Sequence, residues 1–262
     1  MALVSAAVIG ANGFIGRNVL ERLRAEGIPT TLIGRQTLCE EWPSSVDVVF
    51  FCAGNSSTVL TRRDPALCLR RNVLDLDDYL LGLKFRRFVH LSSVSVYPTD
   101  VVDKREDAAI DIRSLPLYGA HKLMAECHVM EFAQDWVIVR PGSLFGPGLK
   151  KNLFQDLRSG GSDIWLKRAS HLAALDVRDL ADACVVLAEK AENEVVNVAS
   201  RHVVTVGEIV GLCPREYQFR EERLVDERGL SLDVLGQYWH EGRDRADHMT
   251  AIAEFLAMGR DG

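Results

Sequence analysis

The chain has 262 residues, of which 47% are hydrophobic and 26% charged, and its formal net charge at pH 7 is −6. This length predicts one large domain, or a large domain with a small annex, and the composition is that of a globular protein. The negative charge argues against a nucleic-acid partner, and no apolar run approaches the ~18 residues that a membrane span requires.

The six cysteines and seven histidines are scattered, without a CxxC or an HxxxH pair. This distribution predicts reduced thiols in a cytoplasmic protein and no metal site. The apolar start, MALVSAAVIG, lacks the basic residues of a signal peptide, so we expect it to contain the first strand.

Strand and helix patterns alternate along the chain. Continuous apolar runs predict buried parallel strands, and amphipathic runs predict helices. The expected strands are 3–9, 30–34, 46–54, 86–93, 136–142 and 194–200, and the expected helices are 14–27, 64–83, 118–133, 177–191 and 248–259. This alternation predicts an α/β fold with a Rossmann-type, doubly wound parallel sheet.

The first expected strand leads into the stretch GANGFIG, which contains Gly10, Gly13 and Gly16. Glycine permits a tight turn and lets the backbone approach a pyrophosphate, while the following helix N-terminus supplies amide donors. A glycine triplet alone is weak evidence. Its position between the first strand and the first helix predicts a dinucleotide site.

The stretch YGAHK places Tyr118 and Lys122 four residues apart on one face of an expected helix. An ammonium beside a phenol stabilises the phenolate and lowers the pKa of the phenol toward the range of a general acid or base. Alone, the pair is weak evidence. Ser93, which ends the fourth expected strand in HLSSVSVYP, would point into the same crevice and hydrogen-bond a substrate oxygen while Tyr118 transfers the proton.

In the order and spacing of its motifs, the chain resembles the extended short-chain dehydrogenases/reductases, the NAD(P)-dependent epimerase/dehydratase group. The resemblance runs from Val4 to about Val210. It depends on GANGFIG, DVVFFCAG, NV at 72–73, HLSSVSVYP, YGAHK, RPGSLFGPG, DVRDLADA and NVAS. It implies a dinucleotide-binding domain at 1–142 and 173–203, with a small C-terminal substrate-binding subdomain, or lid, at 143–172 and 204–262.

The resemblance also implies roles for single residues. The catalytic residues would be Ser93, Tyr118 and Lys122, with Lys122 also holding the nicotinamide ribose. The residues lining the cofactor would be Gly10, Asn12, Gly13, Phe14, Ile15, Gly16, Arg35, Cys52, Ala53, Gly54, Asn72, Leu91, Ser92, Tyr118, Lys122, Pro141 and Ser143. The substrate contacts would be Ser93, Ser95, Ser143 and Arg168.

Gly34-Arg35 follows the second expected strand, where NAD-selective relatives carry an acidic residue. A carboxylate there would repel a ribose 2′-phosphate, whereas a guanidinium pairs with it. We therefore expect NADP to be preferred, with NAD as the alternative; an exposed loop arginine without a role is the competing interpretation. Eleven residues separate Arg35 from Asp47, so we expect no complete strand between 36 and 45.

The family implies a nucleotide sugar as the small-molecule substrate and a homodimer, with Leu123 and Met130 among its contacts. Three functions remain open: an NADPH-dependent reductase of a keto group, at C4, of a nucleotide-linked sugar; an NAD-dependent nucleotide-sugar 4-epimerase; and a non-catalytic dinucleotide-binding regulator. The Ser/Tyr/Lys set argues against the regulator. Val94-Ser95 stands where sugar-nucleotide dehydratases carry an Asp-Glu pair, which disfavours dehydration.

Overall fold

A six-stranded parallel sheet forms the centre of the computed structural model, which describes residues 3–34 and 36–258. The strands pair in the order β10-β5-β4-β3-β1-β2. They are β1 (Ala6–Ile9), β2 (Thr30–Ile33), β3 (Val46–Phe51), β4 (Phe85–Leu91), β5 (Trp136–Pro141) and β10 (Glu194–Val198). The order reverses at β1, which lies between β2 and β3. The prediction of a doubly wound parallel sheet is therefore confirmed.

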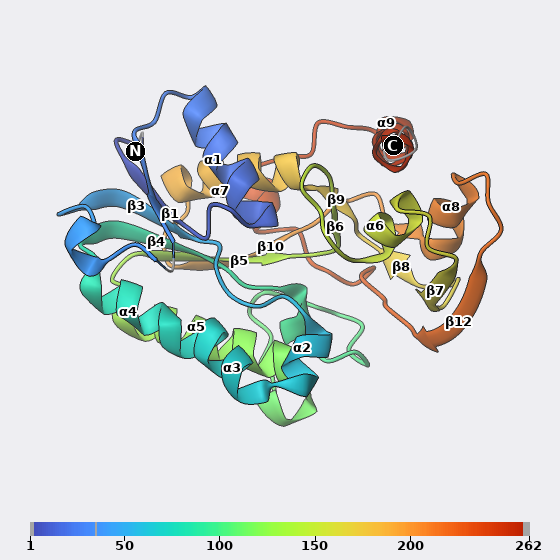
Figure 1. The fold of residues 1–262 in the computed structure, drawn as a ribbon, viewed down its shortest axis with the longest axis horizontal. Helices are drawn as coiled ribbons and strands as arrows, with labels where there is room; N and C mark the ends of the chain where they lie inside the picture. Colours follow the sequence, from blue (N-terminus) through green and yellow to red (C-terminus); the bar gives the residue numbers. More distant parts are fainter. Residues whose placement is uncertain (1–2, 35, 259–262) are drawn as a thin grey trace.

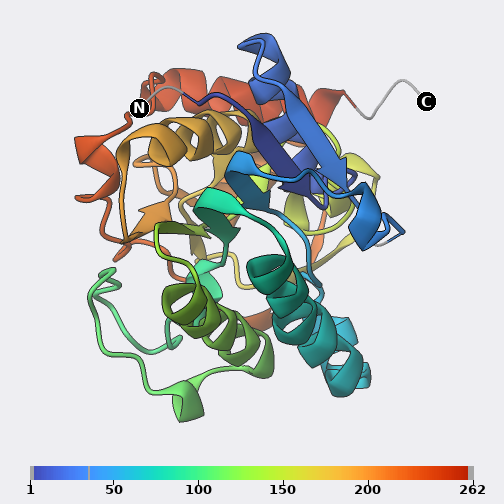
Figure 2. The ribbon, with the colours of Figure 1, turned by 90° about the vertical axis from the view of Figure 1, so that its left-hand side faces the viewer.

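Helices cover both faces of the sheet (Figure 1). One face carries α1 (Phe14–Ala25) and α7 (Val177–Lys190), and the opposite face carries α4 (Asp75–Gly82) and α5 (Leu117–Phe132). In the side view, α4 and α5 lie next to each other beneath the sheet (Figure 2). None of the helices within residues 3–34 and 36–258 combines the length and the apolar character needed to cross a membrane.

The helix expected at 64–83 contains an internal change of geometry. It consists of α3 (Pro65–Leu69), a π-helical turn η2 (Arg70–Leu74) and α4. Asp64 caps it as expected, because its carboxylate accepts the Leu67 N–H at 2.9 Å. A further short helix, α2 (Thr58–Arg63), precedes it and was not expected. The wide turn matters because it carries Asn72 toward the end of β3, as described below.

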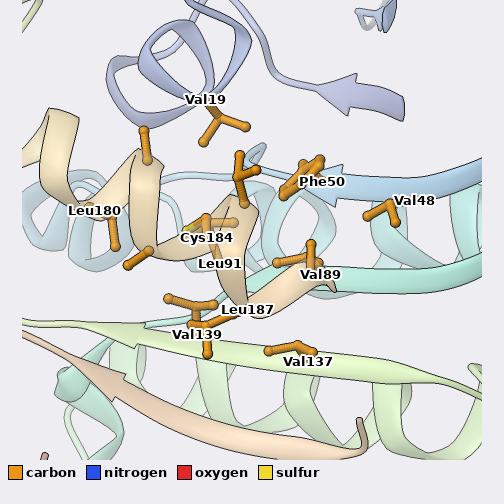
Figure 3. Close-up of a cluster of buried hydrophobic side chains, with 14 of the residues drawn as sticks. Val19, Val48, Phe50, Val89, Leu91, Val137, Val139, Leu180, Cys184 and Leu187 are labelled. Carbon is orange, nitrogen blue, oxygen red and sulfur yellow. The ribbon is translucent and has the colours of Figure 1, made fainter. Parts of the chain in front are cut away.

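The main core lies between the sheet and the helices α1 and α7 (Figure 3). Alternate side chains of three strands face Val19 of α1 and Leu180, Cys184 and Leu187 of α7; they are Val48, Phe50, Val89, Leu91, Val137 and Val139. The side chains between them, such as Val49, Phe88 and Ile138, form a second cluster on the α4 and α5 side. Both faces are buried, which explains why the strand sequences are continuously apolar.

A second lobe lies beyond one end of the sheet (Figure 1). Its elements are β6 (Leu144–Phe145), α6 (Leu153–Arg158), β7 (Asp163–Leu166), β8 (His171–Leu172), β9 (Leu175–Asp176), β11 (Val204–Thr205), α8 (Val206–Gly211), β12 (Gln218–Arg223) and α9 (Arg245–Ala257). Phe145, Phe154 and Phe255 stack in its own hydrophobic cluster. Residues 232–239 pack instead against the main core, on the side of α7.

The connection between β2 and β3 is short, as expected. Within the described residues 36–45 there is a single 3-10 turn, Cys39–Glu41, and no strand. Trp42 ends this turn and stacks on Tyr79 of α4, with ring centroids 5.2 Å apart. β2 therefore forms the edge of the sheet, and the expectation drawn from the spacing of Arg35 and Asp47 is confirmed.

A buried ion pair joins α5 to β5. The Arg140 guanidinium donates to both carboxylate oxygens of Glu126, at 3.1 and 2.7 Å, and both side chains are almost fully buried. Ser92 also hydrogen-bonds Glu126. Arg140 donates further to the Tyr97 hydroxyl at 2.8 Å, and this hydroxyl donates to Asn197 of β10 at 2.8 Å. One polar chain thus links α5, β4, β5 and β10.

We expect Arg140→Met to lower the free energy of unfolding by about 3–5 kcal/mol, because the Glu126 carboxylate would remain buried without its cation. Glu126→Leu/Arg140→Met should recover at least half of this loss, since neither charge is then left unpaired. Urea unfolding followed by circular dichroism measures both. The exposed pair Arg220–Asp163 is the control, and Arg220→Met should leave stability unchanged. A double variant as unstable as Arg140→Met would contradict this account.

Candidate active site

The turn between β1 and α1 is tightly packed. Gly10 has φ +83°, and a Cβ there would lie 2.9 Å from the backbone of Ala53. A Cβ at Gly16 would collide with the carbonyl oxygen of Gly10. The N-cap of α1 is Gly13, which has no side chain to bond the first-turn amides, and no acidic residue lies in that turn. Asn12, Phe14 and Ile15 belong to the same turn. Because no side chain caps them, the backbone amides in the first turn of α1 remain available to an anionic group, as the glycine pattern predicts.

The segment after β3 lies against this turn. Gly54 has φ +116°, and a Cβ there would lie 2.8 Å from Oδ1 of Asn72. This Oδ1 accepts the Asn55 N–H at 2.6 Å, whereas the Asn72 Nδ2 is buried without a partner in the described part of the chain. An orphaned buried donor beside a glycine cradle is what a bound polar ligand would satisfy. The preceding Cys52 is packed into the core, and burial raises the pKa of its thiol to about 12.

Ser93 and Tyr118 meet at the carboxyl end of β4. The Ser93 hydroxyl lies close enough to the Tyr118 phenol to affect its pKa, and it accepts the Ser95 N–H at 3.1 Å. Burial raises the pKa of Tyr118 to about 12, and the interaction with Ser93 offsets only part of this effect. The phenol is therefore protonated at neutral pH. The structure brings these two residues together at the end of β4.

Lys122 lies one turn further along α5. Its Nζ donates to the carbonyl oxygen of Leu91 at 2.6 Å, and 5% of the residue is exposed. Burial lowers the pKa of Lys122 to about 8, although the charge of Glu126 works in the opposite direction. The pKa of Tyr118 lies above its usual value, so the expected net fall toward neutrality is wrong for this structure. Burial of the phenol dominates the shift, and the Lys122 ammonium bonds to the Leu91 carbonyl of β4.

Gly119 was not among the expected site residues, although it lies inside YGAHK. A Cβ at this position would collide with the carbonyl oxygen of Ser95. Glycine therefore lets α5 pack directly against the turn η3 (Val94–Val96) that follows β4. This close approach brings Tyr118 to Ser93. The sequence did carry a signal for Gly119. Glycine is unfavourable inside a helix, so a glycine directly after Tyr118 indicates a close contact at that position.

Two buried carboxylates were also missed. Glu126 follows Lys122 by four residues, so the shared helix face was a usable signal. Glu227 accepts hydrogen bonds from the Ser143 hydroxyl at 2.8 Å and from the Ala173 N–H at 2.8 Å. The sequence carried no signal for Glu227, because 84 residues separate it from Ser143. The position of Glu227 depends on how the second lobe packs against the end of β5.

The expected substrate residues do not all lie together. Ser93 and Ser95 follow β4, and Pro141 and Ser143 lie at the end of β5, the neighbouring strand. Arg168 lies after β7, where its guanidinium stacks on the ring of Phe219 at 4.4 Å. It lines a pocket of about 370 Å³ between α8 and β12, which none of the four other residues lines. Arg35, the expected contact of a 2′-phosphate, lies outside the described residues.

The buried Lys122 predicts a pH-dependent stability. Its pKa falls from 10.5 to about 8 on folding, so between pH 8 and 10.5 the unfolded chain binds more protons there and folding becomes more favourable as the pH rises. Lys122→Met should be more stable than the wild type at pH 7, by up to about 3 kcal/mol, and the difference should vanish near pH 10.5. Urea titrations across this range measure it, with Lys84→Met as an exposed control. A difference that is independent of pH would refute the prediction.

Comparison with known proteins gives a family match over the part of the chain that holds Ser93, Tyr118 and Lys122. The profile described as the NAD dependent epimerase/dehydratase family matches residues 6–199. GDP-6-deoxy-D-mannose reductase of Pseudomonas aeruginosa is 30% identical over 166 residues, which is 55% of this chain and 53% of the relative. The aligned stretch thus spans about half the length of that curated relative.

Two solved structures show the similarity in three dimensions. MoeE5 in complex with UDP-glucuronic acid and NAD superimposes with a TM-score of 0.83 at 20% identity, covering 97% of this chain and 99% of the other. RMD from Pseudomonas aeruginosa complexed with NADPH superimposes with a TM-score of 0.79 at 21% identity, with the same coverage. At these identities, the likeness concerns the fold.

Proposed function

The chain belongs to the NAD dependent epimerase/dehydratase family, and from this premise we propose that it is an NAD(P)-dependent oxidoreductase that reduces a keto group, at C4, of a nucleotide-linked sugar. The 30% identical reductase of a GDP-linked deoxysugar supports a substrate of this class. The observation that carries the proposal is the close placement of Ser93 and Tyr118 at the carboxyl end of β4, with Lys122 one turn along from Tyr118 on α5.

The protonation of this pair favours reduction. A keto oxygen that gains a hydride needs a proton, and Tyr118 holds one at neutral pH because burial raises its pKa to about 12. The Ser93 hydroxyl lies beside the phenol, and its single proton can turn to the same keto oxygen and orient it. Lys122 places a positive charge beside the site and is held there by the Leu91 carbonyl. It would stabilise the phenolate that remains after proton transfer.

The residues around β1 and β3 fit a nicotinamide dinucleotide. The glycine cradle at Gly10 and Gly16, the free amides at the start of α1 and the orphaned Asn72 Nδ2 suit its pyrophosphate and ribose groups. NADPH, when bound, supplies the hydride. Lys122 would also hold the nicotinamide ribose, and Pro141 and Ser143 would lie near the ring.

The second lobe would bind the sugar nucleotide, because it stands beyond the carboxyl ends of the sheet strands. Residues 143–172 and 204–262 would form this subdomain. A homodimer through α5 is part of the proposal, with Met130 exposed and Leu123 half-buried on that helix. The six cysteines are all free thiols, which supports a cytoplasmic site of action.

Tyr118→Phe tests the proposal. It removes the proton donor but keeps the ring, so turnover of a nucleotide-linked 4-keto sugar should fall by about 10²–10⁴-fold with little change in melting temperature. Ser93→Ala should lower turnover less, through loss of one hydrogen bond. Lys122→Ala should weaken cofactor binding as well as raise the pKa that governs activity. Near wild-type turnover in Tyr118→Phe would show that Tyr118 is not the proton donor, and absence of turnover in the wild type would favour the non-catalytic regulator.

Cofactor choice gives a separate prediction. We expect NADPH to bind more tightly than NADH, because the Arg35 guanidinium can pair with a 2′-phosphate. Arg35→Asp should narrow or reverse this preference, since a carboxylate repels the phosphate and accepts from a 2′-hydroxyl. Calorimetric titration of both cofactors measures it. Equal affinities in the wild type would count against NADP.

The exchange of cofactor separates reduction from epimerisation. A reductase must release oxidised cofactor after each turnover, whereas a 4-epimerase oxidises and re-reduces the same carbon. Purified protein that retains NAD and interconverts two 4-epimeric nucleotide sugars, without consuming added NADPH, would establish the epimerase instead.

A further inference from the structure

Glu227 is a buried carboxylate of the second lobe that reaches the carboxyl end of β5. Its Oε1 accepts a hydrogen bond from the Ser143 hydroxyl at 2.8 Å. Its Oε2 accepts bonds from the backbone N–H of Ala173 at 2.8 Å and of Ser143 at 3.3 Å. Only 7% of Glu227 is exposed. Donors from two separate segments therefore converge on one carboxylate.

The neighbours of Glu227 favour its ionised form. Burial is the largest effect and raises the pKa of Glu227 above its usual value, and the bonds from Ser143 and Ala173 and the nearby Lys104 ammonium offset only part of this rise. Lys104 is itself buried, and its Nζ donates to the carbonyl of Asp226 at 2.8 Å. The Asp226 side chain is paired with Arg228 at 2.6 Å. Both backbone N–H groups bond to Oε2 and can only donate, so they hold this oxygen as an acceptor, and together with the nearby ammonium they stabilise the carboxylate.

The Ser143 hydroxyl is thereby given one orientation. A serine hydroxyl carries one proton and two lone pairs, and with Glu227 as a carboxylate the proton of Ser143 is directed at its Oε1. Only lone pairs remain for a ligand at this end of β5, which is where ligands of parallel sheets bind. A ligand hydroxyl can donate to such an oxygen. A ligand group that carries only acceptors, such as a carboxylate, is repelled.

We propose that Glu227 is a specificity-determining positioning residue that makes Ser143 a hydrogen-bond acceptor, so that the site selects a sugar hydroxyl over a uronate carboxylate. The inference rests on the proposed function, in that the ligand is a nucleotide sugar. It goes further by naming the sugar class: neutral rather than acidic.

Glu227→Gln inverts the arrangement without changing its shape. The N–H groups of Ala173 and Ser143 cannot rotate, so they require the amide oxygen of the glutamine at the Oε2 position. The amide NH₂ must then occupy the Oε1 position and donate to the Ser143 oxygen. The Ser143 proton is released toward the ligand, and the serine becomes a donor.

Calorimetric titration of the enzyme saturated with NADP⁺ compares two matched pairs: UDP-glucose with UDP-glucuronic acid, and GDP-mannose with GDP-mannuronic acid. We expect the wild type to bind the neutral sugar at least about tenfold more tightly than the acid, in whichever pair it accepts. Glu227→Gln should reduce this ratio to about threefold or less. Asp226→Asn removes a neighbouring charge that does not contact Ser143, and it should leave the ratio unchanged.

The Ser143→Ala background isolates the serine. There, Glu227→Gln should no longer alter the ratio. Equal binding of both sugars by the wild type, or the same effect of Glu227→Gln with and without Ser143, overturns the inference while nucleotide-sugar binding stands. Failure to bind all four compounds overturns the proposed function and the inference together. If Glu227→Gln does not fold, Ser143→Ala alone decides, because loss of the acceptor oxygen must also reduce the ratio.

Discussion

The ion pair between Glu126 and Arg140 lies where α5 packs against β4 and β5. Both charges are buried, so separating them would leave an unpaired buried charge and strongly destabilise the fold. The ion pair therefore fixes the position of α5 against the sheet. The adjoining residues in the chain are those of the site: Ser92 precedes Ser93, and Arg140 precedes Pro141. The hydrogen bonds to Ser92 and Tyr97 extend the same constraint to the end of β4. The geometry of the site depends on this contact.

Burial shifts the pKa values of Tyr118 and Lys122, two of the titratable groups of α5, in opposite directions. It keeps the proton on Tyr118 and makes Lys122 easier to deprotonate, because each shift favours the neutral form. A dinucleotide that approached Lys122 with its ribose oxygens would add acceptors to an ammonium that now has one carbonyl partner at 2.6 Å. In the proposed reaction this arrangement would suit a proton donor, with a cation nearby to stabilise the anion it leaves behind.

The second lobe contributes to the site through a few long-range contacts. Lys104, in the loop after β4, exchanges backbone hydrogen bonds with Gly229 and Ser231. Glu227 lies between these contacts and the end of β5. The orientation of the Ser143 hydroxyl thus depends on a segment that is far away in sequence, so this side of the candidate site forms only when both lobes are folded.

The sequence by itself determined the alternation of strands and helices, the glycine turn and the set of Ser93, Tyr118 and Lys122. Each of these signals is local, since apolar periodicity, glycine spacing and a four-residue helical repeat need no partner from elsewhere in the chain. It also predicted the short connection after β2 from chain length alone. It did not predict the π-helical turn at Asn72, because a single long helix has the same apolar pattern.

Only the tertiary structure decided the pKa values and the buried carboxylates. Whether the pKa of Tyr118 rises or falls depends on how deeply the phenol is buried. In this structure burial raises the pKa, although Lys122 lies four residues along the same helix. Arg168 was expected to contact the substrate together with Ser93, Ser95 and Ser143, yet it packs on Phe219 and lines a pocket that those residues do not line. Glu227 meets Ser143 across 84 residues of chain. Such contacts have no sequence period, so only the packing of the two lobes specifies them.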